Sequence, residues 1–228
     1  MELNARFEGL EMDFSRCDFH ILGCGAIGSS AAIQLARMGA EQFTLYDADK
    51  VEGVNIGVSQ YDNRHIGMPK VEALRDIIQD INSEANTYLA NEWFKEYYYN
   101  GFTNTIIILG FDSMESRMEA VQLIDESQWP DPAWLIDGRM GAEHYQQYIV
   151  KGPQILEKYL DVWYDDASSD PEPCNLKATS YCSNMAGSFI ANAVRKIITD
   201  QPLGSDFSFN FPIMRLSAFT DVNSRIKT

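Results

Sequence analysis

A glycine-rich stretch near the start of the chain could hold the phosphates of a nucleotide. Residues 23–28 are Gly-Cys-Gly-Ala-Ile-Gly, which matches the pattern G-x-G-x-x-G. The first glycine permits a tight turn, the second lets a phosphate approach the backbone, and the third lets a helix pack on a strand. The phosphates would lie on N–H groups at the positive end of the helix dipole. We therefore expect nucleotide contacts from Gly23, Gly25, Ala26, Ile27 and Gly28.

An acid follows the last of these glycines at the spacing expected for a ribose contact. Asp47 ends an apolar run about 20 residues beyond the glycine turn and could accept hydrogen bonds from ribose hydroxyls. This feature alone leaves NAD and ATP both open, and a glycine turn used only for packing remains an alternative.

The segment after Asp47 favours a nucleoside triphosphate. It carries the amide side chains of Asn55 and Gln60 and leads to Lys70 at the start of an expected helix. A cation there could neutralise phosphate charge. A dehydrogenase has no need for such a segment. An ordinary surface lysine is the alternative for Lys70, although the helix dipole disfavours a cation at that end.

Alternating strands and helices must position these residues, and they predict an α/β fold of the Rossmann-like, doubly wound class. We expect a mostly parallel sheet with helices on both faces. The expected strands are residues 19–22, 42–46, 85–90, 105–109, 134–137, 145–150 and 207–215. The expected helices are residues 29–38, 69–81, 116–125 and 183–199, and residues 93–99 are expected to form a loop or a turn of helix.

Ligands of doubly wound folds bind beyond the carboxyl ends of the strands. Four residues follow expected strands closely, namely Gly23, Asp47, Asp112 and Asp137. We therefore expect them to meet at one edge of the sheet.

Length predicts a single domain over residues 1–228. Its nucleotide-binding half covers about residues 19–125, and its second half covers residues 126–228. An acidic stretch with two prolines, residues 165–173, is expected to form a mobile crossover loop.

The charge balance argues against two kinds of partner. The net charge is −15 and the sequence pI is near 4.5, so phosphate backbones and anionic lipid surfaces are repelled. The charge either serves solubility or suits a basic protein partner. The first 18 residues have no basic and apolar signal pattern, and no apolar run could span a bilayer, so a cytoplasmic location is expected.

The four cysteines show no metal-binding spacing, because none are paired as C-x-x-C, so no structural zinc is expected. Cys182 just precedes the expected helix 183–199, whose dipole could lower the pKa of a catalytic thiol. A small, half-buried filler residue is the alternative for Cys182, and Cys174 lies nearby.

Four motifs in order resemble the adenylation domain of the ThiF/MoeB/HesA group, relatives of ubiquitin-activating enzymes. They are G-x-G-x-x-G-S at 23–29, L-x-D-x-D-x-V-E-x-x-N at 45–55, I-G-x-P-K-V-E-A at 66–73, and a strand end with Asp112 and then Arg117. The similarity covers about residues 19–125 and resumes at 179–198.

This resemblance implies an activity and its ligands. ATP with Mg²⁺ would bind over the glycine turn, and the C-terminal carboxylate of a ubiquitin-like or sulfur-carrier protein, or of a peptide, would become an acyl-adenylate. Lys70 would steady the phosphates, and Asp112 would bind Mg²⁺. Arg117 would lie near the nucleotide or brace the loop. The residues assigned to the nucleotide besides the glycine turn are Asp47, Asp49, Asn55, Gln60, Lys70 and Arg117.

One departure from the family raises an alternative. Val58 stands where relatives carry an arginine that contacts phosphates, and Arg64, or Arg6 or Arg16 of a second subunit, are candidate substitutes. The chain is therefore either an active adenylyltransferase or a degenerate nucleotide-binding module that recruits a partner. An NAD-linked oxidoreductase is a third reading. Small residues in helix 183–199 make a homodimer plausible.

Overall fold

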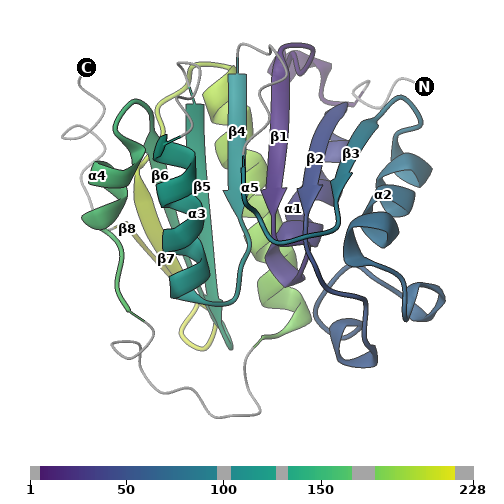
Figure 1. Cartoon of the computed structure of the whole chain (residues 1–228). Coiled ribbons are helices and arrows are strands. Elements are labelled where there is room, and N and C mark those ends of the chain that lie inside the picture. The colour runs from purple at the N-terminus through teal and green to yellow at the C-terminus, as the bar shows by residue number, and fades with distance from the viewer. Residues whose placement is uncertain (1–5, 97–103, 127–132, 166–177, 219–228) are drawn as a thin grey trace.

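A single sheet of eight strands organises the protein (Figure 1). The computed structural model describes residues 6–96, 104–126, 133–165 and 178–218. The strands lie in the order β3-β2-β1-β4-β5-β6-β7-β8. Their bounds are β1 Cys17–Leu22, β2 Gln42–Tyr46, β3 Asn86–Ala90, β4 Asn104–Leu109, β5 Ala133–Gly141, β6 His144–Lys151, β7 Asp206–Asn210 and β8 Arg215–Ala218.

The first five strands in this order pair in parallel, and β6, β7 and β8 continue the sheet antiparallel. The order 3-2-1-4-5 is that of a doubly wound Rossmann sheet. The sequence-based prediction of the fold class is confirmed.

Helices cover both faces of this sheet, as expected (Figure 1). One face packs against helices α1, α2 and α5, whose apolar residues share a single buried cluster with β1 and β2. The other face packs against α3 and α4. The helices are α1 Ala26–Arg37, α2 Lys70–Ile81, α3 Met114–Glu126, α4 Ile155–Leu160 and α5 Ser180–Ile198. Short 3-10 turns cover Glu8–Leu10, Gly53–Asn55 and Asn63–His65.

The central strand β4 shows why the sequence forms this sheet. Residues 105–109 are all β-branched or leucine, and all are buried, because helices cover them from both sides. A strand buried on both faces lacks alternation and carries a continuous apolar run, which made it the clearest prediction.

The expectation of one terminal strand over residues 207–215 is wrong. That segment forms β7, a turn, and the start of β8. Pro212 lies in the turn, where it cannot donate to a strand ladder, and Met214 has φ 50°. The Met214 N–H donates to the Phe211 carbonyl at 3.0 Å and closes the hairpin.

Other helix boundaries differ from the predicted ones. Helices α1 and α5 begin three residues before their expected starts, and α4 was not predicted, because six residues are too few to show a helical period. Residues 93–96 form no helix, whereas 97–99 and most of the expected crossover loop, 166–173, lie outside the described residues. Among the described helices, none is long and apolar enough to cross a bilayer.

The small residues of α5 approach α1 of the same chain. A Cβ added at Gly187 would lie 2.2 Å from Ser30 Oγ, and Ala186 is fully buried. Glycine therefore permits this close contact between the two helices. These two small residues therefore pack within one chain, and the homodimer stays a prediction.

Candidate nucleotide site

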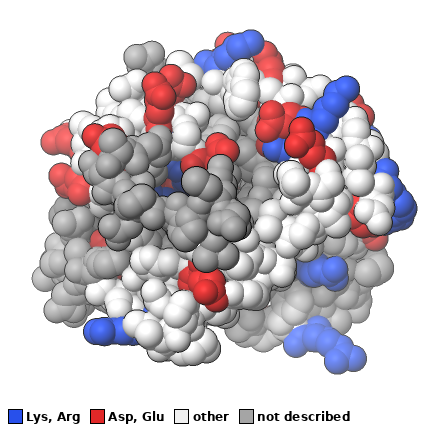
Figure 2. Space-filling view, turned by 90° about the horizontal axis from the view of Figure 1, so that it is seen from below, with Lys and Arg blue, Asp and Glu red and all other residues white. Residues whose placement is uncertain are grey.

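The carboxyl ends of four parallel strands meet at one edge of the sheet. Leu22 pairs in register with Tyr46 on one side and with Leu109 on the other, and Leu109 pairs with Asp137. The residues that follow these positions therefore share an edge, as the sequence predicted. Figure 2 views the molecule from this side, and most of the Lys and Arg side chains that it shows lie toward the periphery.

The glycine turn between β1 and α1 has three glycines with three different environments. Gly23 has φ +92°, and its N–H donates to the Tyr46 carbonyl at 2.9 Å. A Cβ at Gly28 would lie 1.9 Å from the Gly23 carbonyl oxygen, so this glycine permits helix α1 to pack on the turn. A Cβ at Gly25 would meet nothing within 4 Å. The backbone at Gly25 is thus open to a ligand.

Helix α1 begins at this opening. Its first residues are Ala26 and Ile27, and the first intrahelical bond runs from the Ser29 N–H to the Gly25 carbonyl at 3.0 Å. The N–H groups before Ser29 have no partner within the helix, as at any helix start. Together with the dipole, they favour an anion such as a phosphate.

Asp47 closes the glycine turn from the end of β2. One carboxylate oxygen accepts from the Cys24 N–H at 2.8 Å, and the other accepts from the Asp49 N–H at 2.9 Å. Burial raises the pKa of Asp47, and the nearby Lys70 ammonium partly offsets this effect. The acid expected to bind ribose therefore also holds the turn in shape.

Lys70 points its ammonium group toward this carboxylate. As the first residue of α2, it donates from Nζ to Asp49 at 2.8 Å and lies 3.7 Å from Asp47. Burial lowers the pKa of Lys70, but the hydrogen bond to Asp49 and the charge of Asp47 outweigh it, and the net shift is upward. The lysine is cationic, and its side chain is only 11% exposed.

The amide side chains of the 47–68 segment have local partners. Asn55 accepts from the Glu52 N–H at 2.8 Å and caps the 3-10 turn Gly53–Asn55. Gln60 donates from Nε2 to Asn184 of α5 at 2.9 Å. Asn55 therefore orders the segment, and Gln60 ties it to α5.

Two further contacts hold this segment, and the sequence analysis assigned neither. Tyr61 is buried, and its hydroxyl donates to the Cys24 carbonyl at 2.5 Å in the glycine turn. Ser183 of α5 donates to the Val58 carbonyl at 2.7 Å. Val58, in the position of the family's arginine, is thus held against α5. A single aromatic residue in a polar stretch was the only signal for Tyr61.

Asp112 and Arg117 lie at the turn after β4 and differ in burial. Asp112 is exposed at the sheet edge. Arg117 is buried and donates to the carbonyl oxygens of Leu109 and Phe111. These bonds fit the bracing role expected for Arg117, and its place near a nucleotide stays a prediction.

A metal at this edge would have few protein ligands. Among the described residues, no three His, Cys, Asp or Glu side chains are grouped to hold an ion. Magnesium is often bound by one or two carboxylates together with substrate phosphates. The exposed carboxylate of Asp112, on the turn that packs against Gly23, fits that donor set.

A buried charge cluster beneath the turn was missed by the sequence analysis. Asp137, expected at a strand end, lies within β5 and pairs with both Arg117 and Arg139. The Tyr159 hydroxyl donates to the same carboxylate at 2.9 Å. The spacing Asp-x-Arg in a strand was visible, but the partners come from α3 and α4.

The expected position of Cys182 is wrong. It lies within the first turn of α5, and its side chain is fully buried in the core against α1 and the sheet. A side chain without exposure is not placed to meet an acyl group, because the core packs around it. Cys174 lies outside the described residues.

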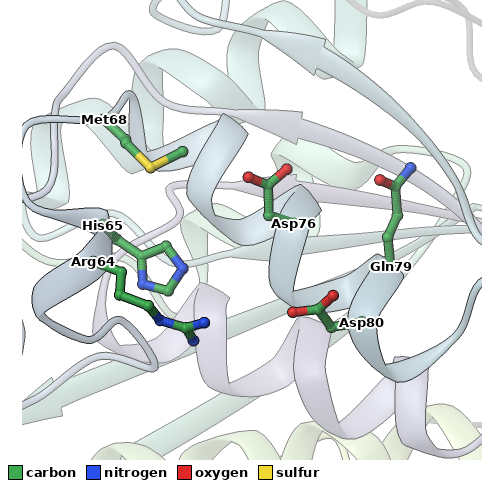
Figure 3. Close-up of a pocket in the computed structure, with 6 residues that line it drawn as sticks. All are labelled: Arg64, His65, Met68, Asp76, Gln79 and Asp80. Atoms are coloured by element: carbon green, nitrogen blue, oxygen red, sulfur yellow. The ribbon is translucent and has the colours of Figure 1, made fainter.

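Arg64 lies in the 3-10 turn Asn63–His65. It pairs with Asp62 and lines a hollow of about 350 Å³ beside α2, together with His65, Met68, Asp76, Gln79 and Asp80 (Figure 3). Asp76 and Asp80 lie roughly 9 and 15 Å along the helix from Lys70. A role for Arg64 in place of the arginine expected at Val58 stays a prediction. Arg16 lies at the amino end of β1, and any role of Arg6 or Arg16 in a second subunit stays a prediction.

Comparison with known proteins identifies a family and several relatives. The model of the ThiF family matches residues 6–224. A tRNA threonylcarbamoyladenosine dehydratase of Bacillus subtilis is 29% identical over 126 residues, covering 55% of this chain and 49% of that protein. Ubiquitin-like modifier-activating enzyme 5 of Caenorhabditis elegans is 35% identical over 71 residues, covering 31% and 17%. The chain thus spans half or less of the length of these relatives.

Solved structures share the fold. PaaA superposes with a TM-score of 0.68 at 18% identity, covering 91% of this chain and 66% of PaaA. Escherichia coli MccB with ATP gives 0.66 at 16% identity, covering 90% and 64%. E. coli tRNA N6-threonylcarbamoyladenosine dehydratase gives 0.64 at 18% identity, covering 87% and 92%.

Proposed function

Because this chain belongs to the ThiF family, we propose that it is an ATP-dependent adenylyltransferase that activates a C-terminal carboxylate. One observation carries the proposal. An open backbone at Gly25, a helix start at Ala26, and the Asp47–Lys70 pair converge at one sheet edge. Together they offer what a triphosphate needs, which is N–H donors, a cation and a ribose acceptor.

The proposed reaction is transfer of AMP to the acceptor carboxylate. A carboxylate oxygen attacks the α-phosphorus of ATP, the bond to the β-phosphate oxygen breaks, and pyrophosphate leaves. The product is a mixed anhydride, the acyl-adenylate. Such chemistry depends on positioning and on charge stabilisation rather than on a covalent enzyme group.

Each residue has a role in this proposal. Asp47 holds the ribose, the N–H groups at Gly25, Ala26 and Ile27 cradle phosphate, and Lys70 compensates phosphate charge. Asp112 holds Mg²⁺, which screens the phosphates when bound. Asp49, Asn55, Gln60 and Arg117 support them, because each orders Lys70, the 47–68 segment or the turn after β4.

The acceptor class follows from the family and from charge. We propose a ubiquitin-like or sulfur-carrier protein, or a peptide, with a free C-terminal carboxylate. MccB has been crystallised with MccA, and other relatives are ubiquitin-like modifier-activating enzymes. The net charge of −15 favours an acceptor with a basic surface.

Lys70→Ala tests the proposal directly. The change removes the cation beside the phosphates, so the affinity for ATP–Mg²⁺ should fall at least tenfold, since a hydrogen bond to a charged group contributes about 1.5–3 kcal/mol. Isothermal titration calorimetry measures this loss. Lys50→Ala is the matched control. Lys50 is an exposed lysine on the segment that precedes α2, so its removal should leave the affinity unchanged.

Catalysis needs a second measurement. ATP–pyrophosphate exchange should appear when wild-type protein meets a suitable acceptor, with peptides ending in Gly-Gly as the first probes, and Lys70→Ala should abolish it. Tight NADH binding without ATP binding would overturn the proposal in favour of an oxidoreductase.

A partner-recruiting module without turnover is the second candidate. One observation favours it, namely that Val58 replaces the expected arginine and that its carbonyl accepts from Ser183, which closes the segment onto α5. ATP binding without exchange, across acceptors that bind the protein, would support this candidate.

A further inference from the structure

One carboxylate beneath the sheet edge pairs with two buried arginines. Arg117 Nη1 donates to Asp137 Oδ1, and Arg139 Nε donates to Asp137 Oδ2 at 2.7 Å. The Tyr159 hydroxyl donates to the same Oδ2 at 2.9 Å. Asp137 is 1% exposed, so these charge-assisted bonds lie in a low-dielectric interior where they are strong.

The first arm of this cluster, Arg117, contacts the turn after β4. Arg117 donates to the carbonyl of Leu109 at 3.5 Å and to that of Phe111. Leu109 and Phe111 flank Gly110, and Phe111 immediately precedes Asp112. The orientation of Arg117 therefore sets the backbone that presents the Asp112 carboxylate.

The second arm, Arg139, contacts the segment after α4. Arg139 Nη1 donates to the Val162 carbonyl at 2.8 Å, and its guanidinium lies 5.0 Å from the ring centre of Tyr164. Burial alone would lower the pKa of Arg139, but the Asp137 carboxylate, together with Tyr159 and Tyr148, outweighs it, and the net shift is upward. Arg139 is thus a fixed cation that holds residues 162–164 against the sheet.

The two arms converge on the same corner of the molecule. Trp163 Nε1 donates to the Met114 carbonyl at 3.1 Å, at the first residue of α3. The segment held by Arg139 therefore lies against the turn held by Arg117. Residues 109–114 and 159–164 form one wall that is secured from beneath by Asp137.

We propose that Asp137 is a positioning residue that couples residues 109–114 to residues 159–164 through its two arginines. Arg139 donates from Nε to Asp137 and from Nη1 to Val162 through one rigid, planar guanidinium, so a shift of Arg139 moves the carboxylate and, with it, Arg117. The consequence for adenylation rests on the proposed function, because it assumes that Asp112 holds Mg²⁺. The mechanical coupling itself does not.

Arg139→Lys tests the coupling at a distance. Lysine keeps the charge but lacks the planar guanidinium that bonds both Asp137 and Val162, so both segments should open more often. In hydrogen–deuterium exchange on the whole chain, peptides within 159–165 and within 109–116 should exchange about tenfold faster. Trp163 also joins the two segments through Met114, so faster exchange reports transmission through Asp137 when it extends to 109–112 and Trp163→Phe leaves those residues slow. Tyr159→Phe, a milder change, should show the same pattern more weakly.

Two controls separate this effect from general loosening. Trp163→Phe breaks the hydrogen bond to Met114 but leaves the cluster intact, so 109–112 should keep its slow exchange. Phe14→Leu, a core change against Phe19 at the opposite end of the sheet, should leave both segments unchanged at a similar loss of stability.

A ligand readout connects the coupling to function. ATP affinity is measured by calorimetry with Mg²⁺ and again with EDTA. In Arg139→Lys the affinity in EDTA should match wild type, whereas the gain produced by Mg²⁺ should fall at least threefold. A purely structural role would change neither value well below the unfolding temperature.

The outcomes separate the two proposals. If Arg139→Lys loosens 159–165 and leaves 109–116 unchanged, the coupling is overturned, whatever the ligand data show. An unchanged gain from Mg²⁺ in Arg139→Lys would overturn the functional consequence. If wild-type protein binds no ATP, the proposed function fails, and hydrogen–deuterium exchange alone decides the coupling.

Discussion

Two charge clusters lie along the same edge of the sheet, and they differ in their contact with water. Lys70 bonds to Asp49, whose side chain is 55% exposed, beside an open backbone at Gly25. Arg117 and Arg139 instead share Asp137, which is sealed in the interior. An exposed counter-ion can be exchanged for a phosphate at little cost, whereas a buried one cannot. The first cluster suits ligand binding, and the second suits holding shape.

Removing the carboxylate from each cluster should give the largest difference between the two clusters in the free energy of unfolding. Asp137→Ala leaves two buried guanidiniums without their partner and should lower the free energy of unfolding by about 3–5 kcal/mol. Asp49→Ala removes an exposed partner and should cost less than about 1 kcal/mol. Urea unfolding of both variants measures the difference, and equal losses would refute the distinction drawn between the clusters.

The glycine turn also has one position that serves packing, Gly28, and one that is open to a ligand, Gly25, and we expect smaller effects there. Gly28→Ala places a methyl group 1.9 Å from the Gly23 carbonyl and should destabilise the fold by roughly 1–3 kcal/mol. Gly25→Ala points its methyl into open space, so stability should hold while ATP affinity falls. Thermal unfolding and calorimetry on the two variants check this, and a stable Gly28→Ala would contradict the packing role.

The smallest effect concerns pH. The folded-state pKa of Lys70 lies above its ordinary value of 10.5, so the contribution of its ion pairs is complete below 10.5 and is lost only as pH rises through the folded-state pKa. ATP affinity should therefore show no loss assignable to Lys70 between about pH 7 and 10. Comparing the pH profile of wild type with that of Lys70→Arg measures this, and a wild-type decline near pH 9 that the arginine variant lacks would contradict it.

The nucleotide end of the molecule was largely predictable, because its pattern is local. Three glycines and Asp47 lie within 25 residues, and parallel strands must bring their carboxyl ends to one edge whatever else the chain does. The class of fold, the order of elements through α3, and the meeting of Gly23, Asp47 and Asp112 at that edge followed from periodicity and spacing alone.

Several side-chain roles could not follow from spacing. Gln60 bonds to Asn184, which lies 124 residues away, and Asp137 meets partners from α3 and α4. Cys182 preceded the expected helix in the sequence, yet α5 begins two residues before it and buries it. Helix starts are set by competing caps and by packing, which a single sequence specifies poorly.

The sequence by itself determined where a nucleotide is expected, because glycine spacing, a strand-end acid and a lysine at a helix start impose local chemistry. Only the tertiary structure decided which charges are open to a ligand and which are sealed. That distinction depends on burial, and burial arises when elements far apart in the chain pack together. Lys70 and Arg139 both pair with aspartates in the folded chain, and packing left one of the two partners of Lys70, Asp49, exposed but buried the partner of Arg139.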